Sequence, residues 1–191
     1  MYDAKHMMPS ADVIALYSNC RAVNRTVCVG GMSKRELLAE LRNNGIKLNK
    51  LGEALFEHDE FTTAETRSAL ETMEISVADL GYLQGAAIAL ISERAAELGL
   101  SLCPLELGPH LRLQFLDQPE GYWGHPPSQH QAPPGSVTVA SRPLTGDDDT
   151  PKGFYLRRMK GILWLRGYRS DPEHIWSPED HFVFCRPCPA A

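Results

Sequence analysis

The spacing of apolar residues changes near the middle of the chain. Before Gly99, apolar residues recur every three or four positions, as on one face of a helix. After Gly99 they alternate singly with polar residues, as in half-buried strands. The first pattern predicts about four helices within residues 33–98, and the second predicts a mainly antiparallel sheet of four to five strands within residues 110–184. Helices followed by strands are typical of an α+β fold, with an N-terminal helical block packed on a C-terminal sheet.

Local signals support individual helices. Ser33 and Glu36 have the spacing of a capping box, and Thr62 and Glu65 repeat it. Gly99 follows the last helical pattern, where a glycine commonly ends a helix. The helices are therefore expected over residues 33–44, 48–56, 62–73 and 84–98.

Alternation and turn residues mark the strands. Lys160 and Gly161 separate two alternating runs, which predicts a β-hairpin. A stretch rich in Pro, Gly, Gln and His, residues 118–135, is expected to form a long loop beside the sheet. The strands are expected over residues 110–117, 137–139, 154–158, 162–168 and 181–184.

The ends of the chain differ from its centre. Residues 1–31 show no sustained periodicity, so we expect a poorly ordered N-terminal extension there. Residues 32–184 are expected to form one domain, and 185–191 a short tail that holds Cys185 and Cys188. A metal or redox role for these two thiols is disfavoured because prolines flank them and no ligand pair with zinc spacing accompanies them.

The distribution of charge along the chain gives the main indication of function. The chain has a net charge of −5, which disfavours general nucleic-acid binding, yet the window 151–169 holds six basic residues and no acidic one. Such a window on a rigid hairpin is a candidate anion-binding surface on an acidic protein. The basic residues are Lys152, Arg157, Arg158, Lys160, Arg166 and Arg169.

Strand alternation suggests which side chains would form this surface. If the leucines of both hairpin strands face the core, arginines and aromatics share the opposite face, and the predicted strand 110–117 adds to them. Guanidinium groups bind phosphate or carboxylate, and aromatic rings stack on bases or cations. We therefore expect an anionic ligand: a nucleotide, a single-stranded nucleic acid or an acidic protein segment. The predicted ligand-binding residues are Arg112, Gln114, Tyr155, Arg157, Trp164, Arg166 and Tyr168.

Three alternatives to this binding module remain open. The same face is also typical of ordinary cross-strand pairs that only stabilise a sheet. A small enzyme would instead bring His110, Arg112 and Arg157 together with Asp180 or His181 in a cleft at the end of the sheet. A structural or partner-stabilising protein would have neither site.

The sequence supports no cofactor, no metal site and no assigned catalytic residue, since phosphate-loop, dinucleotide and zinc-protease motifs are missing. The run Asp147–Asp149 does not match a calcium-binding loop. No stretch has the length of an apolar membrane span, and no signal peptide is evident, so a cytoplasmic location is expected.

Four segments of the chain form a recognisable set: Leu102–Gln114, Gly153–Arg158, Trp164–Tyr168 and Trp176–Asp180. Together they resemble a family of small bacterial proteins for which no activity is established. The resemblance covers about residues 32–184, which agrees with the predicted domain. Some members are labelled as helicases, but no nucleotide-hydrolysis motif in this chain supports that label. The resemblance therefore leaves the function open.

Overall fold

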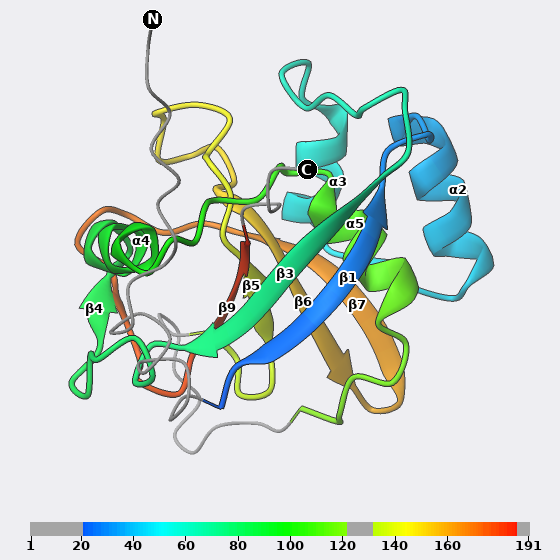
Figure 1. The fold of residues 1–191 in the computed structure, drawn as a ribbon. Coiled ribbons are helices and arrows are strands. Elements are labelled where there is room, and N and C mark those ends of the chain that lie inside the picture. The colour runs from blue at the N-terminus through cyan, green and yellow to red at the C-terminus, as the bar shows by residue number, and fades with distance from the viewer. Residues whose placement is uncertain (1–20, 122–131, 187–191) are drawn as a thin grey trace, which may run out of the picture.

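The computed structural model describes residues 21–121 and 132–186, which form an α+β fold around a mixed sheet (Figure 1). Its helices are α2 (Lys34–Asn43), α3 (Lys50–Glu57), α4 (Ile88–Glu97) and α5 (Leu107–Gln114). Its strands are β1 (Val23–Val29), β2 (Lys47–Leu48), β3 (Ser68–Ser76), β4 (Ala86–Ala87), β5 (Val137–Val139), β6 (Gly153–Met159), β7 (Ile162–Tyr168), β8 (Ile175–Trp176) and β9 (His181–Cys185).

Seven of the strands form the main sheet, in the order β1-β3-β9-β5-β6-β7-β2. Neighbours are antiparallel except for β5 with β9 and β2 with β7, which are parallel. The two short strands β4 and β8 pair separately. None of the helices in the described part of the chain is long and apolar enough to cross a membrane.

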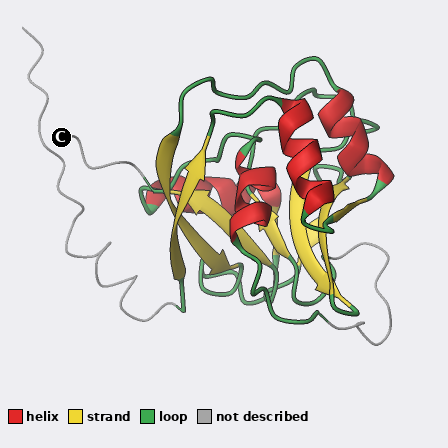
Figure 2. Ribbon diagram, turned by 90° about the vertical axis from the view of Figure 1, so that its right-hand side faces the viewer, coloured by secondary structure: helices red, strands yellow, loops and turns green. Residues whose placement is uncertain are grey.

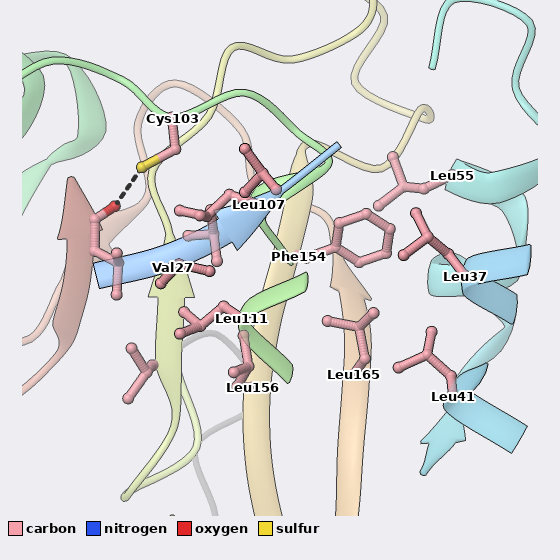
Figure 3. Packing of buried hydrophobic residues seen from close by; sticks show 14 of the residues in the cluster. Val27, Leu37, Leu41, Leu55, Cys103, Leu107, Leu111, Phe154, Leu156 and Leu165 are labelled. Atoms are coloured by element: carbon pink, nitrogen blue, oxygen red, sulfur yellow. Dashed lines mark hydrogen bonds between the residues drawn. The ribbon is translucent and has the colours of Figure 1, made fainter. Parts of the chain in front are cut away.

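Two apolar clusters lie on opposite faces of the sheet, and helices lie on both sides of it (Figure 2). On the three-helix face, α2, α3 and α5 cover the sheet, and Phe154 of β6 lies with Leu37 and Leu55 of the helices (Figure 3). On the other face, which we call the α4 face, α4 packs through Ile91 into a cluster with Phe182 of β9. Burial of these side chains on both faces supplies the main driving force for folding.

The expected N-terminal helical block is wrong, because strands interleave with the helices. The largest change concerns residues 62–73, predicted to be helical, where Ser68–Ser76 form strand β3 instead. This strand is hydrogen-bonded on both edges, to β1 and to β9, and its residues from Thr72 to Ser76 are all buried. The capping-box spacing of Thr62 and Glu65 is a weak local preference, and the pairing of β3 on both edges overrides it.

The predicted strand 110–117 is also wrong, because Leu107–Gln114 form helix α5. Leu107 and Leu111 are four residues apart and both are buried, so they share one face of the helix. The alternation that suggested a strand begins only at His110 and misses Leu107. Pro109 lies in the first helical turn, where its missing N–H removes no intrahelical hydrogen bond.

The limits of the domain also change. Val23–Val29 lie within the predicted extension but form strand β1, whose Val27 and Val29 are buried in the three-helix cluster. The prediction of poor order is therefore wrong for Val23–Val29, while residues 1–20 lie outside the described residues. At the other end Cys185 belongs to β9 rather than to a tail, and Cys188 lies outside the described residues.

Several local predictions are confirmed. Helix α2 begins after Ser33, and both capping-box hydrogen bonds to Glu36 are present. Helix α4 falls within the expected range, and helix α3 matches its expected range except that it extends one residue further, to Glu57. Strands β6 and β7 form the predicted hairpin, and Lys160 and Gly161 at its turn have φ of 52° and 72°. Positive φ at both central turn residues is the geometry that gives a tight hairpin its twist.

Candidate anion-binding site

The hairpin places its arginines and aromatics on one face. Tyr155 of β6 lies directly opposite Arg166 of β7, and Arg157 lies opposite Trp164. Side chains at directly opposite positions share a face of the sheet, and here Phe154, Leu156 and Leu165 take the three-helix face. The arginine and aromatic residues therefore lie on the α4 face, as does Tyr168, two residues beyond Arg166.

Cations and aromatic rings alternate along this face. The Arg166 guanidinium lies 5.1 Å from the centre of the Trp164 ring and 6.0 Å from that of Tyr155. The Lys47 ammonium of β2 lies 5.8 Å from the Trp164 ring. Each such contact attracts a cation to the electron-rich face of a ring, so Arg166 is restrained between two rings.

Sequence reasoning missed Lys47. Lys47 belongs to the short strand β2, which pairs in parallel with β7 so that Lys47 lies opposite Trp164. The two residues are far apart in the sequence, and a two-residue strand has no alternation to recognise. Only the pairing brings this cation beside the hairpin.

A cavity of about 350 Å³ opens beside the hairpin on the same face. Strands β5 to β7 supply part of its wall, and the segment that leads into β8 supplies another part. Arg169 and Asp171 also line it, so its wall carries both signs of charge. Its volume is in the range of small-molecule sites. Its lining includes Tyr155, Arg166, Tyr168, His174 and Trp176.

Two donors on residues that line this cavity lack acceptors. The Nε–H of Arg166 and the indole Nε1–H of Trp176 are buried, and neither has a hydrogen-bond partner within the described residues. Arg166 also forms no ion pair with a carboxylate in that part of the chain. Buried polar atoms without a partner also occur away from this cavity, for example on Arg112, so the missing ion pair of Arg166 is the more specific observation.

Burial also shifts the protonation equilibria here. Burial lowers the pKa of Arg157, the Tyr155 hydroxyl raises it, and the nearby Arg166 lowers it. Burial raises the pKa of Tyr168 far above its ordinary value, so its hydroxyl stays neutral. The residues that line the cavity therefore include one restrained guanidinium and a tyrosine whose hydroxyl stays neutral.

Arg112 does not belong to this site. It lies on α5 at the three-helix face and is completely buried, with one hydrogen bond from its Nη1 to the Oε1 of Gln118. Burial, together with repulsion from Arg158, lowers the pKa of Arg112 to about 10. The sheet separates it from Arg166, so the structure does not bring these two predicted residues together.

Gln114 has a structural role instead. Its Oε1 accepts from the Cys28 N–H at 3.0 Å, and its Nε2 donates to the Cys28 carbonyl at 2.8 Å. Strand β1 is at the edge of the sheet, and the side-chain amide of Gln114 satisfies the two backbone groups of Cys28 as a neighbouring strand would. Gln114 is thus not available to the predicted ligand.

The residues proposed for an enzyme cleft do not converge. His110 is buried on the three-helix face, where its Nε2 accepts from the Gly30 N–H at 3.1 Å, whereas Arg157 lies on the α4 face. His181 is hydrogen-bonded at 3.0 Å to Glu74, which also forms an ion pair with Arg25. Within the described residues, no three His, Cys, Asp or Glu side chains could jointly hold a metal ion.

In comparisons with known proteins, no family model, curated protein or solved structure matches the chain. The resemblance to a bacterial family therefore stays a prediction, and the function has to be argued from the site.

Proposed function

We propose that the protein is a binding module for an anionic ligand, whose acid group contacts Arg166 on the hairpin face. One observation carries the proposal. Arg166 is restrained between Tyr155 and Trp164, adjoins a cavity, and forms no ion pair with a carboxylate within the described residues. A bound carboxylate or phosphate would pair with this guanidinium, and charge-assisted hydrogen bonds of this kind are among the strongest in proteins.

The surrounding charge supports the same ligand class. Lys47 and Arg157 flank the aromatic Trp164 on the side of the sheet that holds Arg166. Several cations on one face raise the local concentration of anions even on a protein of net charge −5. Ordinary cross-strand stabilisation accounts for the ring contacts, but it gives the charge of Arg166 no carboxylate partner within the described residues.

The packing favours a small anion over a single-stranded nucleic acid. Such nucleic acids bind by stacking successive bases on free aromatic faces. Trp164 already contacts two cations, and the Trp176 ring contacts the rings of Tyr168, His174 and Phe182. An acid group can reach Arg166 without displacing these contacts, and the cavity of about 350 Å³ suits a small molecule.

Thermal-shift and calorimetric titrations in low salt test the proposal with adipate, AMP, inorganic phosphate and the oligonucleotide (dT)8. The key variant is Arg166→Gln, which keeps a polar side chain and removes the cation. Arg158→Gln is the matched control because Arg158 lies on β6 at a position that alternates with Arg157 and forms an ion pair with Glu120 at 3.6 Å.

We expect at least one compact anion to bind the wild-type protein and Arg158→Gln equally, and more weakly as salt is added. Arg166→Gln should weaken this binding at least about tenfold, because it removes a charge-assisted hydrogen bond. The proposal is wrong if no compact anion binds, or if binding survives in Arg166→Gln. Binding of (dT)8 that persists in this variant would locate nucleic-acid recognition on another surface.

A further inference from the structure

A second cavity, of about 380 Å³, lies beside the end of β1. Its wall is mostly apolar and is formed by the segment that follows β1, by the start of β3 and by one side of α5. In the sheet, β3, β9 and β5 lie between β1 and the hairpin, so this cavity is separate from the one beside the hairpin. Its lining includes Met32, Arg67, Ala69, His110 and Leu113.

His110 presents an oriented donor to this cavity. The residue is 2% exposed, and its Nε2 accepts from the Gly30 N–H at 3.1 Å, so the proton of the neutral imidazole lies on Nδ1. Burial and the charge of Arg67 lower the pKa of His110, which favours this neutral form. Nδ1 donates no hydrogen bond within the described residues, yet it is not one of the polar atoms there that are fully enclosed without a partner. Its N–H is therefore open to the cavity that His110 lines.

The Arg67 side chain lies across the backbone next to this donor. Gly31 has a φ of 71°, and a Cβ added there would lie 2.5 Å from the Cγ of Arg67 and 3.0 Å from its Nε. The glycine therefore leaves room for Arg67, while the adjacent Gly30 contacts His110. Arg67 forms no ion pair within the described residues, and the carboxylate of Glu106 lies on the Nε2 side of His110, at 3.8 Å. A cation and an oriented N–H donor thus border the same cavity.

We infer that this cavity binds a small monocarboxylic acid with an apolar body. The carboxylate pairs with the Arg67 guanidinium and accepts from the Nδ1–H of His110. The apolar body lies against Met32, Ala69 and Leu113, where its burial adds to the affinity. One cation and one neutral donor match a single negative charge, which favours a carboxylate over a doubly charged phosphate. The site is independent of the proposed anion site on the hairpin, and either can exist without the other.

Three small molecules form a matched set of probes. Benzoate has an acid group and an apolar ring, benzamide keeps the shape and loses the charge, and acetate keeps the acid group and loses the ring. Calorimetry uses the full chain with Arg166→Gln, so that binding at the hairpin does not contribute. We expect benzoate to bind at least about tenfold more tightly than either of the others, because benzamide lacks the charge-assisted hydrogen bonds and acetate buries little apolar surface.

A second substitution identifies the cation. Arg67→Gln, added to Arg166→Gln, should weaken benzoate at least about tenfold and leave the affinity for benzamide unchanged. Arg35→Gln is the matched control, because Arg35 is an exposed arginine on α2 that does not line the cavity. The inference is wrong if benzoate does not bind, if it binds equally well without Arg67, or if Arg35→Gln weakens it as much. None of these results decides the proposed function, which is tested by its own titrations of the wild-type protein.

NMR of isotope-labelled histidine rings tests the contact with His110 without changing a buried residue. In the free protein, the His110 ring should be neutral with its proton on Nδ1. Saturating benzoate should shift the Nδ1 resonance, because this N–H gains an acceptor, and the shift should be lost in Arg67→Gln. A resonance that does not move with benzoate, or a proton found on Nε2 in the free protein, would overturn the inference.

Discussion

The carboxyl group of Asp180 gives a prediction whose size follows from the structure. Asp180 is 7% exposed, and its Oδ2 accepts from the Ser177 N–H at 2.7 Å. Burial raises the pKa of Asp180 from 3.8 to about 6, and this effect outweighs the hydrogen bond from Ser177. The native state therefore holds a proton on Asp180 at pH values where the unfolded chain has already lost it.

The sign and size of the effect follow from linkage. Between pH 3.8 and about 6 the native state binds more protons than the unfolded chain, so the free energy of unfolding falls as the pH rises. A shift of one pKa unit corresponds to about 1.4 kcal/mol, so the loss approaches about 3 kcal/mol above pH 6. Such a loss is a large part of the typical stability of a domain, about 5–15 kcal/mol.

Asp180→Asn removes the titration and keeps an oxygen that can accept from the Ser177 N–H. Urea unfolding, followed by circular dichroism from pH 4 to pH 8, gives the stability difference between variant and wild type. We expect Asp180→Asn to gain stability relative to the wild type as the pH rises from 4 to 7, by up to about 3 kcal/mol. Asp59→Asn, which removes a charge at an exposed position, controls for net charge. A difference that stays constant across this pH range would refute the reasoning.

Two further predictions concern the β1 side of the sheet. The hydrogen bond to Glu74 raises the pKa of His181. The stabilisation that protonated His181 gives the native state is therefore complete below pH 6.5 and is lost as the pH rises through the native pKa. In His181→Gln, the free energy of unfolding should not show this decline with rising pH. Gln114→Ala leaves the Cys28 backbone groups without their side-chain partner, so we expect the free energy of unfolding to fall by about 1 kcal/mol and the Cys28 amide to exchange faster. Gln114→Glu should be intermediate, because its carboxylate can still accept from the Cys28 N–H. Unchanged exchange in Gln114→Ala would show that this side chain does not protect the edge.

The sequence alone predicts those elements that are determined by contacts between neighbouring residues. The capping box of Ser33 and Glu36 lies within one helical turn, and the turn at Lys160 and Gly161 fixes the hairpin register. The shared face of the arginines and aromatics followed from that register alone. These parts could be predicted because each depends on contacts between residues close in the chain.

The elements that the sequence alone does not predict depend on contacts between residues far apart in the chain. Strand β3 forms because β1 and β9 pair with both of its edges, and no local signal in residues 62–73 reports those partners. Lys47 and Trp176 also reach the site through distant contacts. Lys47 does so because β2 pairs in parallel with β7, and Trp176 because its ring packs on Tyr168. Arg112 lies on helix α5 and not on the predicted strand, so strand alternation assigns it to the wrong face of the sheet.

The position of the cavity follows from how the helices divide between the two faces. Three helices cover one face, whereas α4 packs over the part of the α4 face that belongs to β3 and β9. The hairpin half of that face is left to the segment before β8, which encloses a cavity instead of packing tightly. What distinguishes this region from an ordinary sheet surface is the Arg166 guanidinium, which lies between two aromatic rings beside the cavity and forms no ion pair with a carboxylate within the described residues. A bound acid group would supply the negative charge that this guanidinium lacks.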